Sequence, residues 1–155
     1  VKSYACDERR KDQVIGSDWY VADSFTDSAV STDTCLVCWA PDHLTKIYTD
    51  LHFSSGNSVV KWTPTSTLAE PSSCRDVTLS LSSPKTGIGY SETAHVCSNS
   101  FGPHNVASTT FGSTWDGHEP KANWYEATEG VSIVHSPPGT SAGVSMTISH
   151  QWCEC

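Results

Sequence analysis

The sequence is poor in positive charge. Nine Lys and Arg stand against seventeen Asp and Glu in 155 residues, which gives a formal net charge of −8. Nucleic acids are bound by clustered cations, but the basic residues are scattered apart from Arg9-Arg10-Lys11. No apolar run approaches the roughly 20 residues of a membrane-spanning helix. We therefore expect no nucleic-acid partner and no membrane insertion.

Aliphatic residues are also scarce. Leu, Ile, Val and Phe together account for 28 of the 155 residues, a share so low that disorder has to be considered. Six Trp and five Tyr offset this scarcity because each can bury a large apolar area. Seven Cys can add covalent closure where the core is thin. We expect an ordered chain, with residues 1–155 forming a single domain.

The pattern of side chains predicts strands. Residues 144–152 place apolar side chains and His150 on one side and polar side chains on the other. Residues 46–53, with Thr49 on the apolar side, and residues 76–82 show the same period of two. The turn-forming residues 54–57 predict a hairpin from 46–53 to 59–63, and Glu129-Gly130 predicts a tight hairpin between 124–128 and 131–136. Weaker patterns indicate further strands at residues 19–25, 34–40, 93–98 and 106–111.

These short strands, separated by Gly, Pro and Ser, determine the expected fold class. We expect an all-β protein, an antiparallel β-sandwich or barrel stabilised by disulfides, with one sheet face in the core and a Ser/Thr face in water. Only residues 10–15 have a helical pattern. The expectation therefore includes at most one short helix, near the N-terminus.

The number of cysteines is odd. Three bridges would leave one thiol that is buried, reactive or linked to a second chain, so a monomer and a disulfide-linked dimer both stay open. A redox or zinc role for Cys35-x-x-Cys38 lacks the required helix or ligand spacing. We expect structural disulfides, no metal and no cofactor. The candidates for bridges are Cys6, Cys35, Cys38, Cys74, Cys97, Cys153 and Cys155, with Cys6 and the last two placed to pin the chain ends together.

One stretch, residues 111–126, concentrates groups that could bind or react. It combines three carboxylates, one His and four large aromatic rings, in part on a predicted Gly/Pro loop. Aromatic rings stack on sugars and carboxylates bond hydroxyls, although Trp115 covering a sheet end and Trp124 in the core would be a purely structural alternative. The candidate binding residues are Trp115, Asp116, His118, Glu119, Trp124 and Tyr125.

Taken together, the size, the Ser/Thr richness, the placement of Cys6 and Cys153/Cys155 and the dibasic Arg9-Arg10 resemble the small cysteine-containing proteins that fungi secrete. These include effectors and elicitors, so the resemblance implies an extracellular, non-enzymatic protein that binds a host protein or glycan through surface loops. Two alternatives stay open. One is a small extracellular hydrolase using His118 with Asp116 or Glu119, and the other is a carbohydrate-binding module or lectin using Trp115 and Trp124.

Overall fold

The computed structural model describes residues 2–13, 19–30, 43–69, 75–83, 85, 87, 89–96, 100–119, 125–140 and 143–153. Side chains are described for residues 44–68, 76–83, 85, 87, 89–93, 100–117, 128–140 and 143–151. All elements in these ranges are β-strands, and no helix occurs among them. All the strand pairs are antiparallel. The expected all-β, antiparallel class is therefore confirmed.

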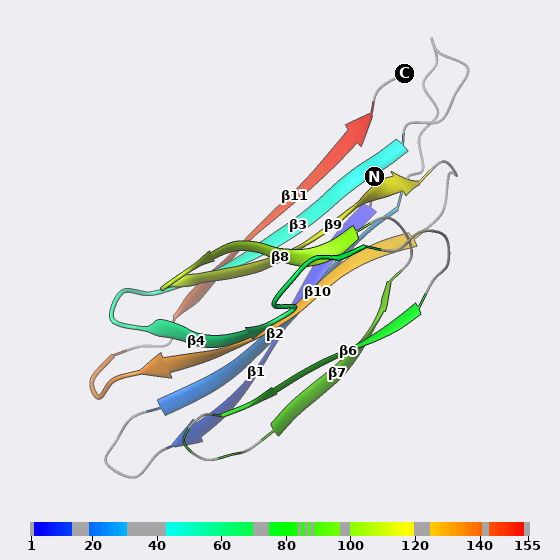
Figure 1. Cartoon of the computed structure of the whole chain (residues 1–155). Helices are drawn as coiled ribbons and strands as arrows, with labels where there is room; N and C mark the ends of the chain where they lie inside the picture. Colours follow the sequence, from blue (N-terminus) through cyan, green and yellow to red (C-terminus); the bar gives the residue numbers. More distant parts are fainter. Residues whose placement is uncertain are drawn as a thin grey trace.

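The strands form three sheets (Figure 1). The four-stranded sheet has the order β1-β2-β10-β4, made of β1 (Lys2–Gln13), β2 (Trp19–Val30), β10 (Tyr125–Ser136) and β4 (Ser58–Thr63). The five-stranded sheet has the order β11-β3-β9-β8-β5, made of β11 (Val144–Cys153), β3 (His43–Phe53), β9 (Thr110–Glu119), β8 (Ser100–Ala107) and β5 (Leu68–Ala69). A two-stranded sheet pairs β6 (Arg75–Ser82) with β7 (Gly89–Val96).

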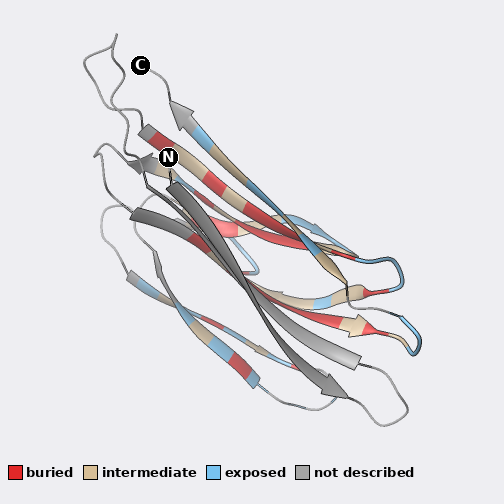
Figure 2. Cartoon of the chain, turned by 180° about the vertical axis from the view of Figure 1, so that it is seen from behind, coloured by how far each residue is buried: buried red, intermediate tan, exposed pale blue. Residues whose placement is uncertain are grey.

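The core lies between the two larger sheets. Leu51, Phe53 and Phe111 from the five-stranded sheet are buried against Val134 from β10, and Ser113 of β9 forms a hydrogen bond with Thr128 of β10. Figure 2 shows the buried positions concentrated along the facing strands, while exposed positions gather at loops and edges. Strands such as β6 contribute only their alternate side chains to the core, whereas β10 is buried on both faces.

Several predicted elements are confirmed. Residues 144–152 fall within β11, residues 46–53 within β3 and residues 76–82 within β6. In β6 the alternation is complete, because Leu79 is fully buried between the exposed residues Thr78 and Ser80. The predicted strand at 34–40 lies outside the described residues.

The one segment with a helical pattern is extended where it is described, since Arg10–Gln13 belongs to β1, which agrees with the expectation of at most one short helix. Other local predictions are wrong. Glu129-Gly130 is no turn, because β10 runs straight through it while pairing with β2. Residues 54–57 do turn the chain, but they carry it from one sheet to the other instead of closing a hairpin. The predicted strand at 106–111 is interrupted by the turn at Ser108-Thr109. A local sequence pattern predicts where a turn can form or which side chains of a strand share a face. Which strands pair depends on residues far apart in the sequence.

Candidate functional site

The predicted binding stretch is a strand, not a loop, up to Glu119, because Thr110–Glu119 form β9 in the middle of the five-stranded sheet. Trp115 is fully buried and packs with Leu44 and Ile47. This corrects the expectation that its ring is presented on a loop. An indole with no exposed surface offers no face on which a sugar could stack, so the residue contributes to the core.

Asp116, the next residue, is exposed on the outer face of the same sheet. Its Oδ2 lies 3.6 Å from Nζ of Lys46 on the neighbouring strand β3, and an exposed ion pair of this kind contributes little to stability. His118 and Glu119 end β9 and Tyr125 begins β10, but their side chains are not among those described. Trp124 lies outside the described residues altogether. Binding through these residues stays a prediction.

A different set of polar side chains comes together on the outer face of the five-stranded sheet. The carboxylate of Asp50 on β3 is almost fully buried although it lies on the outer side. Nδ1 of His104 donates to Asp50 Oδ1 at 2.7 Å, and Nδ2 of Asn105 donates to Asp50 Oδ2 at 3.1 Å. A buried carboxylate requires such donors to offset its desolvation. We call Asp50, His104 and Asn105 the aspartate cluster.

Gly112 makes the aspartate cluster possible. It lies on β9 between Asp50 on β3 and His104 on β8, directly opposite both in the strand register. A Cβ on Gly112 would stand 1.9 Å from Asp50 Oδ1 and 2.5 Å from the carbonyl oxygen of Thr49. Only a bare backbone at this position leaves room for the carboxylate to reach across the middle strand.

The cluster holds the imidazole of His104 in one orientation. Its ring stacks on the ring of Tyr48, with the centroids 4.6 Å apart and the planes at 29°. The backbone at Asn105 has a φ of +46°, in the left-handed region that Asn adopts more readily than other non-glycine residues. Among the described residues, Nε2 of His104 has no hydrogen-bond partner, and the side chain is about one-third exposed. The available chemistry is therefore an oriented ring nitrogen that can exchange a proton or a hydrogen bond with a ligand.

Three connections meet at the end of the sandwich next to the aspartate cluster: 54–57, 107–109, and the described part of the β10–β11 connection, 137–140 with Gly143 (Figure 1). The amide of Ser54 donates to the carbonyl of Gly143 at 2.8 Å, and that of Val59 donates to the carbonyl of Ser108 at 2.7 Å. Asn57 is buried and donates from Nδ2 to the carbonyl oxygen of Ser54 at 2.8 Å, so the first connection is fixed from within. We call these three connections the loop end.

The loop end carries no charged residue in a chain of net charge −8. The sequence has no Asp, Glu, Lys or Arg at residues 53–60, 105–115 or 136–149. Its exposed residues are small and uncharged, with Val106 as the one large exposed hydrophobic residue described in the adjoining strand β8. Sequence reasoning overlooked these uncharged runs, although they were visible in the sequence. The aspartate cluster was not visible, because Asp50 and His104 are 54 positions apart.

Two further observations limit the chemistry of the described part. No group of three or more His, Cys, Asp or Glu that could hold a metal ion occurs among the described residues. The described residues also form no helix that is long and apolar enough to cross a membrane. Cys6 lies in β1 and Cys153 in β11, but their side chains are not described, and the other five cysteines lie outside the described residues.

Comparisons with known proteins give a fold and no family. No family model matches the chain, and no curated protein sequence matches it. A solved structure that is similar is the delta-toxin of Clostridium perfringens, with a TM-score of 0.58 and 9% sequence identity. The match covers 97% of this chain and 79% of the toxin chain. At this identity the likeness shows the fold alone, and it supports the β-sandwich form of the expected all-β class.

Proposed function

We propose that this chain is a secreted, toxin-like recognition protein of the effector or elicitor type, which binds an uncharged glycan outside the cell through the loop end and the adjoining aspartate cluster. The observation that carries the proposal is that the uncharged loop end, held by backbone hydrogen bonds, adjoins His104 and Asn105, whose side chains are oriented by Asp50. Neutral sugars offer hydroxyl groups and apolar ring faces, which polar backbone, amide and imidazole groups can bind without ion pairing.

The fold supports this proposal in two ways. Recognition sites are commonly placed on loops that a rigid sheet holds in position. Here the loops are also held by backbone hydrogen bonds of 2.7 and 2.8 Å. The likeness to a toxin extends over nearly the whole chain, which favours a role directed at other cells. An enzymatic role is not needed to explain any of these features.

Secretion and disulfides belong to the same proposal. β1 begins and β11 ends at the same end of the molecule (Figure 1), so a bridge between Cys6 and Cys153 or Cys155 would join the outer strands of the two larger sheets. Disulfides persist in extracellular compartments. A count of free thiols in the unfolded, unreduced protein tests this: one per chain supports three bridges in a monomer, and seven would contradict the proposal.

The recognition role is tested by adding charge and bulk to the loop end without touching the core. In a Ser55→Arg, Ser108→Arg double variant both positions are exposed, so the fold should be retained. Binding to immobilised chitin, glucan and cellulose oligomers should fall at least about tenfold, because several bonded hydroxyls would be lost at about 1 kcal/mol each.

Ser80→Arg is the matched control, since Ser80 is equally exposed but lies on β6. It should bind as the wild type does. Equal binding by the double variant would contradict the proposed surface. Failure of the wild type on all glycans, with retention of a protein from extracellular fluid that the double variant loses, would replace the glycan by a protein partner.

A small hydrolase is a second candidate, because a histidine oriented by a buried carboxylate is the arrangement that general-base catalysis uses. The described cluster supplies His104 and Asp50 for it. Turnover of RNA and polysaccharides should then be lost in His104→Ala. His118→Ala tests the assignment to His118 with Asp116 or Glu119 in the same assay. Equal turnover by a variant and the wild type would remove that residue's assignment, and no turnover by the wild type would remove the hydrolase.

A further inference from the structure

The two-stranded sheet β6–β7 forms a hairpin that packs on the four-stranded sheet through a cluster of apolar side chains. Leu79 and Tyr90 of the hairpin are buried against Val131 of β10 and Phe101 of β8, and Val77 and Leu81 pack against the same cluster. The hairpin shares no ladder hydrogen bonds with either larger sheet in the described strand pairing. Its position therefore depends on what lies in this interface.

Two carboxylates lie in that interface. Thr128 of β10 points toward the five-stranded sheet, where it bonds Ser113, so Glu129 and Val131 point the other way, toward the hairpin. On β7, Glu92 lies on the same side as the buried Tyr90, which donates from its hydroxyl to Glu92 Oε2 at 2.7 Å. Glu129 and Glu92 thus approach each other from the two partners of the docked interface.

One oxygen of the Glu129 carboxylate, Oε2, is buried there and lacks a hydrogen-bond partner among the described residues. Burial, and secondarily the negative charge of Glu92, raises the pKa of Glu129 from 4.5 to about 7. A protonated Glu129 can lie in the interface without this penalty.

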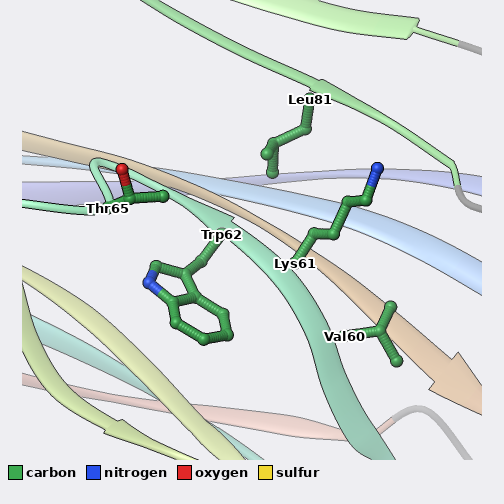
Figure 3. A pocket seen from close by; sticks show the side chains of 5 residues that line it. All are labelled: Val60, Lys61, Trp62, Thr65 and Leu81. Carbon is green, nitrogen blue, oxygen red and sulfur yellow. The ribbon is translucent and has the colours of Figure 1, made fainter.

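No described side chain pairs with Glu129 as a cation. The described side chains on the docked side of β6 are Val77, Leu79 and Leu81. Arg75 falls on the same side by the alternation of the strand, with its side chain outside those described, and the residue opposite Glu129 on β2 is Thr26. The nearest described cation on β4 is Lys61, which extends toward the hairpin beside Leu81 (Figure 3). It lines a pocket of about 290 Å³ with Trp62 and Thr65 and is opposite Ile133, four positions along β10 from Glu129.

We propose that Glu129 is a proton-operated latch: the protonated side chain keeps the β6–β7 hairpin docked on the four-stranded sheet, and ionisation loosens the hairpin while both larger sheets stay folded. The inference is independent of the recognition role. It assigns to the protein a part that changes its packing between mildly acidic and mildly alkaline surroundings.

The size of the effect follows from linkage. If Glu129 returns to its ordinary pKa of 4.5 when the hairpin opens, the opening constant rises about 25-fold between about pH 5.5 and about pH 8, since each pKa unit corresponds to tenfold. Solvent at the half-buried side chain reduces this figure. We therefore expect a rise of between about threefold and about 25-fold.

Hydrogen exchange of backbone amides tests the latch. Protection factors, which are corrected for the pH dependence of chemical exchange, are measured for β6–β7 and for β3–β9 in the same full-length sample at both pH values. Protection in the hairpin should fall with rising pH while that of β3–β9 stays constant. A hairpin without pH response, or an equal loss in both regions, would overturn the proposal.

Two variants identify the group. Glu129→Gln imitates the protonated form and should keep the hairpin protected at both pH values, and Glu92→Gln should reduce the pH response by removing the repulsion. Asp116→Asn is the matched acid-to-amide control on the exposed face of β9 and should respond as the wild type does. A full wild-type response in both glutamate variants would also overturn the proposal.

Discussion

Gly112→Ala should destabilise the protein strongly, because the added methyl group has no room in the sheet. The new Cβ would lie 1.9 Å from Asp50 Oδ1, where no real Cβ contact exists, and 2.5 Å from a backbone oxygen that cannot swing away. The carboxylate of Asp50 must move and lose at least one of its two hydrogen bonds, which costs about 1.5–3 kcal/mol for a charged acceptor. With the strain at Thr49, we expect a loss of about 2–4 kcal/mol in the free energy of unfolding.

Urea unfolding followed by tryptophan fluorescence measures this loss as a lower midpoint at constant slope. Gly89→Ala is the control, because its Cβ would meet nothing closer than a backbone oxygen at 3.9 Å, and it should change stability by less than about 0.5 kcal/mol. The double variant Gly112→Ala, Asp50→Ala should lose less stability than the two single variants lose together, because both changes remove the same hydrogen bonds. A loss below about 0.5 kcal/mol for Gly112→Ala would refute the reasoning.

Three further outcomes follow from the described contacts. Trp115→Ala should cost about 3–5 kcal/mol in urea unfolding, because it empties a fully buried site, and a change near zero would contradict its placement in the core. Asn105→Ala should destabilise more than Asn105→Gly, since both lose the bond to Asp50 but only glycine accepts the φ of +46° freely; equal midpoints would count against this geometry. The contribution of Glu129 to stability should be complete below about pH 4.5 and lost as the pH rises through about 7, because its pKa is raised in the folded protein. Glu129→Gln should therefore gain stability relative to the wild type between pH 5 and pH 8, and a constant difference would contradict the raised pKa.

Part of the fold could be predicted because strands with one buried face have a period of two. Residues 76–82 show this most clearly, with Leu79 buried and its neighbours exposed. The wrong predictions lie where the local sequence is compatible with two different structures. Gly130 allows a turn, yet pairing with Phe25 on β2 keeps β10 extended through it. The turn at 54–57 is real, yet which strand pairs with β3 depends on β9 and β11, far away in the chain.

The candidate site, like the fold, has features that follow from the sequence and features that depend on the tertiary structure. The sequence by itself determined the strand class, the inward side of β3 and the absence of charge in the stretches that become the loop end, because composition and period are local properties. Only the tertiary structure decided that Trp115 is enclosed, that Gly112 makes room for the carboxylate of Asp50, and that Glu129 meets Glu92 beneath the hairpin. Each of these depends on which strands become neighbours, and that choice is made by the burial of whole sheet faces against one another.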